Sequence, residues 1–311
     1  MKKIISIISF PVMVLMSFFL SSVALAGSEI YVGFIDTGTW DSKGSIFLEV
    51  NYKSAEAKKK CEILTEKLFQ ANKKAVFPVK YDSIKNYINS GASDAFDVYN
   101  SKGYLGRYPT ASYMLITNEC GGAVYPYIKL DAKLATKTNE GQNYVIAHKK
   151  SSDKYTVLKN IDLKNTNDNI KKIINEKNKL AKDKFKKIND ETSREINKFS
   201  EKKDYSIYQI SRDQYFIHCV WYFKHKQEEI DTRYYITNSF IVRKDKVLEV
   251  EDFKSSYGDE AEIVYYKLAV KSEDLIFFVT ERLYYEGNSA EILELKNSKL
   301  IRIHDGNYFG C

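Results

Sequence analysis

The sequence has none of the short motifs by which common enzyme classes are recognised. It contains no G-x-S-x-G, no H-E-x-x-H, no glycine-rich phosphate loop and no EF-hand run. These absences leave no local signal for a serine hydrolase, a zinc peptidase, a nucleotide site or a calcium site. None of the four cysteines lies in a C-x-x-C pair, which argues against a structural metal. We therefore expect no metal and no cofactor.

Long apolar runs are missing after the first 26 residues, so we expect no transmembrane segment in the mature protein. The N-terminus itself has two lysines, an apolar run over residues 4–20 and an Ala-Leu-Ala site that ends at Ala26. This order predicts a secretory signal peptide over residues 1–26. No cysteine follows the cleavage site, so nothing indicates a lipoprotein. The sequence predicts a protein of the periplasm or one that is secreted.

Export changes the interpretation of the cysteines, because an oxidising compartment favours disulfides. Four cysteines allow three pairings. Each half of the chain holds two of them, so we expect Cys61 to pair with Cys120 and Cys219 with Cys311. Each bond would close a long loop and stabilise the fold by about 4 kcal/mol on the chain-entropy account.

The four histidines give a weak metal signal at most. His218 and Cys219, with His225 nearby, suggest ligands, but strand alternation places the first two on opposite faces. We interpret these histidines, and also His148 and His304, as core or surface residues.

The hydrophobic pattern predicts an α+β protein with two domains and a long helix between them. Over residues 27–162 we expect a mixed α+β domain, with a helix that is capped by Ser54. Over residues 205–311, alternating apolar residues and short turns predict an antiparallel all-β meander, either a barrel or a sandwich. Every odd position over residues 215–223 is apolar, so we expect that strand to be central.

The segment between the domains, residues 163–204, predicts a basic amphipathic helix or linker. Residues 165–203 contain no glycine or proline, and apolar residues recur there at steps of three and four. Twelve Lys and Arg stand against seven Asp and Glu in this stretch. A basic face of this kind could bind an anionic partner, although the interspersed acids favour a solvated surface. The candidate contacts are Lys171, Lys172, Lys186 and Lys187.

One stretch resembles a catalytic motif. Residues 33–40 read GFIDTGTW, and Asp36-Thr37-Gly38 after two apolar residues resembles the active-site loop of aspartic peptidases. That resemblance implies two carboxylates sharing a proton, and no second motif occurs, so only a retroviral-type dimer could supply the pair. Tyr104-Leu105-Gly106-Arg107 resembles the downstream element of that family. The strongly helical segment between them breaks the resemblance, so we interpret Asp36 as an exposed turn residue.

Tyrosine is abundant, with 24 residues, many of them in adjacent pairs. Neighbours in a strand face opposite ways, so one of each pair is expected to point outward. The candidate binding residues are Tyr234, Tyr265 and Tyr284. The sequence thus favours an exported, non-enzymatic inhibitor or immunity-type protein that binds an envelope toxin or hydrolase and no nucleic acid. The alternatives are a hydrolase, specifically a dimeric aspartic peptidase that uses Asp36, and an adhesive or structural envelope component.

Overall fold

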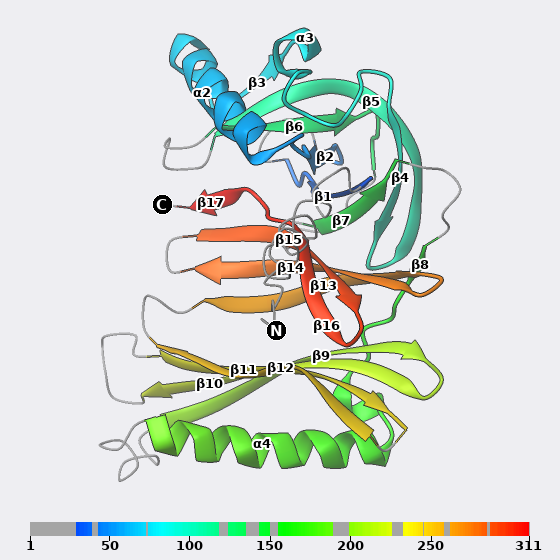
Figure 1. Ribbon diagram of the computed structural model, residues 1–311, viewed down its shortest axis with the longest axis vertical. Helices are drawn as coiled ribbons and strands as arrows, with labels where there is room; N and C mark the ends of the chain where they lie inside the picture. Colours follow the sequence, from blue (N-terminus) through cyan, green and yellow to red (C-terminus); the bar gives the residue numbers. More distant parts are fainter. Residues whose placement is uncertain are drawn as a thin grey trace, which may run out of the picture.

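The fold is mostly β, with three sheets of antiparallel strands arranged in layers (Figure 1). A computed structural model describes residues 29–38, 43–72, 74–117, 124–134, 143–149, 155–188, 199–225, 233–244, 246–257, 262–284 and 287–310. In Figure 1 the first sheet with two helices lies at the top, and the long helix α4 lies at the bottom. The other two sheets lie between them.

The first sheet closes on itself. Its order is β3-β5-β4-β7-β1-β2-β6, and an additional pairing of β5 with β6 closes the ring from β5 to β6, with β3 attached to β5 outside that ring. The closed sheet encloses an apolar cluster that includes Tyr31, Leu48, Phe96 and Ile128. Its strands are β1 (Ile30–Ile35), β2 (Ile46–Glu49), β3 (Val76–Val79), β4 (Ala95–Asn100), β5 (Gly103–Thr117), β6 (Val124–Leu130) and β7 (Asn143–His148).

Two helices accompany this sheet, α2 (Ala55–Asn72) and α3 (Tyr81–Ile84). The expected cap is present, because Ser54 Oγ accepts a hydrogen bond of 3.0 Å from the Ala57 N–H. The Thr65 hydroxyl donates to the Val124 carbonyl at 3.0 Å and so ties α2 to β6. Sequence reasoning missed β4 and the first half of β5, in which Tyr104-Leu105-Gly106-Arg107 forms strand rather than a peptidase element.

The second sheet has the order β12-β11-β10-β9, and α4 (Asp168–Ile188) covers its outer face (Figure 1). Apolar residues of α4 face a row of residues from β10. Phe185 stacks on Phe223, with ring centroids 4.1 Å apart, and Trp221 is fully buried in the same cluster. The alternation of apolar residues in β10 was therefore a correct sign of a central strand. The strands are β9 (Phe199–Ser211), β10 (Gln214–His225), β11 (Arg233–Arg243) and β12 (Lys246–Tyr257).

The expected helix over residues 165–203 is too long. After a 3-10 turn, η1 (Leu163–Asn165), α4 ends at Ile188, and residues 199–203 begin β9. There they pair with β10, for example Glu201 with Phe223. The backbone of a central apolar strand requires partners on both sides, and this requirement overrides the helical preference of the Lys-rich sequence.

The third sheet stacks on the second and completes a sandwich. Its order is β16-β15-β14-β13-β8, and β17 pairs with β15. Tyr208 and Phe216 of the second sheet contact Phe278 of the third. The antiparallel meander expected from the sequence is thus present as two meanders, β9 to β12 in the second sheet and β13 to β16 in the third. The strands are β8 (Thr156–Val157), β13 (Ile263–Ser272), β14 (Leu275–Tyr284), β15 (Gly287–Lys296), β16 (Lys299–His304) and β17 (Tyr308–Gly310).

The two expected domains share a core. β8, which the sequence assigned to the first domain, pairs with β13 of the third sheet. Val32 and Ile146 of the closed sheet pack against Phe277 and Ile292 of the third sheet. A boundary at residue 162 therefore separates β8 from the sheet to which it belongs.

A buried polar cluster also fastens the C-terminal segment to the closed sheet. His304 Nε2 lies 3.0 Å from Glu49 Oε2, and His304 Nδ1 lies 3.0 Å from Asn51 Oδ1. The Asn307 backbone N–H donates to the same Glu49 oxygen at 2.9 Å. Gly306 precedes it where a Cβ atom would lie 1.6 Å from the Ala290 carbonyl oxygen, so only glycine fits. These contacts hold residues 304–307 in place.

Candidate functional site

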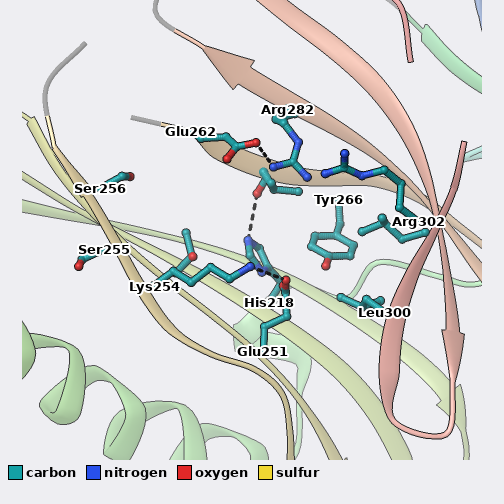
Figure 2. Close-up of a pocket in the computed structure, with 13 residues that line it drawn as sticks. His218, Glu251, Lys254, Ser255, Ser256, Glu262, Tyr266, Arg282, Leu300 and Arg302 are labelled. Carbon is teal, nitrogen blue, oxygen red and sulfur yellow. Dashed lines mark hydrogen bonds and ion pairs between the residues drawn. The ribbon is translucent and has the colours of Figure 1, made fainter. Parts of the chain in front are cut away.

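A cavity of about 390 Å³ lies between the second and third sheets. Figure 2 shows Lys254, Ser255 and Ser256 on one side, which is β12, and Leu300 and Arg302 on the other, which is β16. These two strands are the edges of their sheets, so the cavity lies where the sandwich is open. The other lining residues are His218, Thr237, Glu251, Glu262, Val264, Tyr266, Arg282 and Leu293.

Two irregularities in the pairing of β11 with β12 shape one wall of this pocket. The register shifts between Thr237 and Ser239, and again between Ser239 and Phe240. Such bulges bend a strand and re-aim its side chains. Glu251 pairs with Ser239 between the two shifts, and its carboxylate accepts a hydrogen bond from the Ser239 hydroxyl.

His218, Ser239 and Glu251 form a buried row. Ser239 Oγ lies 2.8 Å from His218 Nδ1 and 2.8 Å from Glu251 Oε2. The second ring nitrogen, Nε2, lies 3.0 Å from the Val264 carbonyl oxygen, so it carries a proton and donates it. Burial lowers the pKa of His218 from 6.5 to about 4, more than the Glu251 charge raises it. The ring is therefore neutral at neutral pH, and its unprotonated Nδ1 competes with Glu251 Oε2 for the single proton of the Ser239 hydroxyl.

Glu251 stays ionised in this row. Burial by itself would raise its pKa, but the hydrogen bond and the charge of Lys254 outweigh burial and lower the pKa. Lys254 Nζ lies 2.9 Å from Glu251 Oε1. The row thus ends in an ion pair at the pocket wall.

The row does not have the geometry of a hydrolase. A catalytic triad places the histidine between the nucleophile and the acid, so that the ring removes the proton of the hydroxyl. Here the hydroxyl lies between the histidine and the acid, and the second nitrogen of His218 is bonded to a main-chain carbonyl. Ser239 has 0% exposure and no access for a substrate. The arrangement positions Glu251 and Lys254 at the wall.

On the opposite side, a buried carboxylate holds two arginines. Glu291 is 0% exposed and accepts hydrogen bonds from Arg282 Nε at 3.0 Å and Nη2 at 2.8 Å. Arg302 Nε lies 3.2 Å from Glu291 Oε1. Although burial disfavours its charge, the hydrogen bonds and charges of Glu291 and Glu262 raise the pKa of Arg282. Both guanidinium groups are fixed in position.

Tyr266 lies between these two groups of residues. Its ring centroid is 4.7 Å from that of His218 (Figure 2). Its hydroxyl is buried next to Ser239 and makes no hydrogen bond of acceptable geometry. Burial raises the pKa of Tyr266 well above its ordinary value, so the hydroxyl remains protonated.

Asp36 takes the Asx-type turn expected from the sequence, because its Oδ1 accepts a hydrogen bond of 2.9 Å from the Gly38 N–H. The expectation that Asp36 is exposed was wrong, since its exposure is 3%. Its backbone bonds to both Gly44 and Ser45.

The tyrosines expected to form a binding surface do not gather. Tyr234 is half-buried beneath α4 against Phe185, and Tyr265 is hydrogen-bonded to Tyr222. Tyr284 is exposed. Both members of the pair Tyr234 and Tyr235 are at least half-buried, because β11 is covered on both faces.

The candidate lysines lie on α4, on the other side of the second sheet from the third (Figure 1). Lys171 lies 3.4 Å from Asp168, and Lys186 lies 3.7 Å from Asp183. Lys172 and Lys187 are exposed. The structure does not bring these lysines together with the pocket.

Cys61 and Cys219 are buried, each inside an apolar cluster, and neither forms a disulfide within the described residues. Burial raises the pKa of a thiol at Cys61 to about 12 and raises that of Cys219 further, so neither is a reactive thiolate at neutral pH. Their expected partners, Cys120 and Cys311, lie outside the described residues. The two pairings remain predictions.

Sequence reasoning missed the pocket almost completely. It interpreted His218 as a core or surface residue, after weighing it as a metal ligand, and did not single out Glu251, Lys254, Arg282 or Arg302. The lining residues run from His218 to Arg302 and come from seven strands, β10 to β16, or lie directly beside them. Because they are so far apart in the sequence, no local motif marks them. One sign of the pocket was available in the sequence: a charged residue at a buried position of a mostly apolar strand, such as Glu291 in β15.

Within the described ranges, no group of three or more His, Cys, Asp and Glu residues could hold a metal ion. No described helix has the length and apolar character of a membrane span. Comparison of the chain with protein-family models, with curated proteins and with solved structures found no match. The geometry of the pocket is therefore the basis for a function.

Proposed function

We propose that the protein is an exported, non-enzymatic binding protein of the cell envelope, and that the pocket between β12 and β16 is its binding site. One observation carries this proposal. Charged groups of the pocket bond to each other, and Ser239 and His218, which are in contact there, are arranged in an order that cannot activate a nucleophile. Fixed polar groups around an open cavity suit recognition.

The pocket has the size and lining of a recognition site. Its volume of about 390 Å³ lies in the range of small-ligand sites, and it combines apolar side chains with a few charged ones. Such a cavity also accommodates a side chain or a chain end of a protein partner. An inhibitor or immunity-type role, in which the partner is a toxin or hydrolase, remains the biological setting that we propose.

Cavity filling tests this proposal. Leu300 lines the pocket, whereas Leu248 on β12 is exposed outside it. A thermal-shift screen of small acids, sugars and peptides should find ligands that raise the Tm of the wild-type protein. We expect Leu300→Trp to abolish these shifts and Leu248→Trp to preserve them. Shifts that survive in Leu300→Trp would place the binding site elsewhere and refute the proposal.

A further inference from the structure

Two cations on opposite sides of the pocket have hydrogen-bond donors that bond to none of the described residues. Lys254 Nζ has three protons and makes one bond, to Glu251, while its side chain is 70% exposed. Arg302 donates from Nη1 to Asp305 and forms an ion pair with Glu291, with Nε 3.2 Å from Oε1, which leaves further donors on its guanidinium group. Figure 2 shows these two side chains on opposite sides of the cavity, from β12 and β16.

Most carboxylate oxygens in and beside the pocket, in contrast, already accept hydrogen bonds from protein side chains. Glu251 Oε1 accepts a bond from Lys254, and Oε2 competes with His218 Nδ1 for the Ser239 hydroxyl proton. Both oxygens of Glu291 accept bonds from arginines. A ligand that only donates hydrogen bonds would find few acceptors there, whereas a ligand that accepts would find the two cations. The hydroxyls of Thr237, Ser255 and Ser256 make no hydrogen bond to the described residues and provide further donors.

The remaining lining is apolar. Val264, Leu293 and Leu300 line the pocket together with the polar residues. The charged groups nearest the cavity are balanced, because Lys254, Arg282 and Arg302 face Glu251, Glu262 and the buried Glu291. A balanced site of this kind favours a singly charged ligand over a multiply charged one.

We propose that the pocket binds a carboxylate carried on a small apolar group, with Lys254 and Arg302 holding the carboxylate from opposite sides. An arginine suits this role because its planar group bonds two carboxylate oxygens at once. The apolar group then contacts Leu293 and Leu300. The carboxylate belongs either to a free small acid or to the C-terminus of a protein partner. This inference rests on the proposed function, since it names the ligand class of the same pocket.

Matched acids and amides test the inference. The probes are N-acetyl-leucine and its amide, and a tripeptide that ends in leucine with a free or an amidated C-terminus. We expect isothermal titration to show binding of both acids and at least about tenfold weaker binding of both amides. Tighter binding of the free-ended tripeptide would identify a protein terminus as the source, and tighter binding of N-acetyl-leucine would identify a free acid.

Two variants complete the test. Lys254→Gln removes an exposed cation, so it should fold normally and weaken binding of the acids about tenfold. Lys187→Gln, on the far side of the molecule, should leave binding unchanged. Equal binding of acids and amides, no binding of either acid, or unchanged binding in Lys254→Gln would overturn the inference. If a neutral ligand binds instead and Leu300→Trp abolishes that binding, the proposed function stands and only the carboxylate is refuted.

Discussion

Acidification should destabilise the protein through His218, and the structure gives the size of the effect. The ring is buried among Ser239, Glu251, Tyr266 and the Val264 carbonyl, and its pKa falls from 6.5 to about 4. Above pH 6.5 the ring is neutral in both the folded and unfolded states and contributes nothing. As the pH falls below 6.5, the unfolded state binds a proton that the folded state does not bind until about pH 4.

The free energy of unfolding must therefore fall as the pH falls through this window. A pKa unit corresponds to about 1.4 kcal/mol, so the full difference is about 3 kcal/mol, and about 2 kcal/mol of it is lost between pH 7 and pH 5. Glu251 acts in the same sense but at lower pH, because its pKa is also lowered relative to its ordinary value. Its contribution stays constant between pH 7 and pH 5 and is lost only as the pH falls further.

Urea unfolding at pH 7 and pH 5, followed by the fluorescence of the buried Trp221, measures the effect. His218→Gln removes the titrating group and keeps a side-chain amide donor. We expect the wild-type protein to lose about 2 kcal/mol more than His218→Gln between the two pH values. If the two proteins lose the same free energy, the ring is not buried in its neutral form, and the account of the row is wrong.

Three further predictions concern other parts of the molecule. His304→Ala removes the histidine partner of the buried Glu49, which keeps its bond from the Asn307 N–H, so urea unfolding should show a loss of about 3 kcal/mol, whereas an unchanged value would contradict the described cluster. Asp36→Asn keeps the acceptor for the Gly38 N–H and should cost about 1 kcal/mol. Acid-dependent proteolysis by the purified protein, lost in this variant, would instead support a peptidase. Non-reducing peptide mapping should link Cys61 to Cys120 and Cys219 to Cys311, and a peptide that links Cys120 to Cys219 would refute both pairings.

Local patterns predicted those elements whose neighbours are close in the sequence. The alternation of Tyr215, Ile217, Cys219 and Trp221 marked β10 correctly, because one face of a strand must be apolar when a helix covers it. The helix that begins near Ser54 was also correct, since its cap is a local hydrogen bond. In both cases the physical cause lies within a few residues.

Elements whose cause lies far away in the sequence were not predictable in this way. Residues 199–203 read as helix but form strand, because β10 supplies their hydrogen bonds. The hairpin of β4 and β5 was missed, and Tyr104-Leu105-Gly106-Arg107 in β5 was compared with a peptidase element instead. Gly103 and Gly106 have positive φ values, 129° and 142°, and Gly103 lies at the turn of this hairpin. The pocket depends on the stacking of two sheets, and no single strand contains enough of its residues to indicate it.

Chemical-shift mapping of the backbone amides during titration with N-acetyl-leucine tests the central claim most directly. If the pocket between β12 and β16 binds the carboxylate, the largest shifts should occur at Lys254, Ser255 and Arg302. The amides of Lys186 and Lys187 on α4 should not shift. Shifts centred on α4 or on the closed sheet, with none at β12 and β16, would contradict the account.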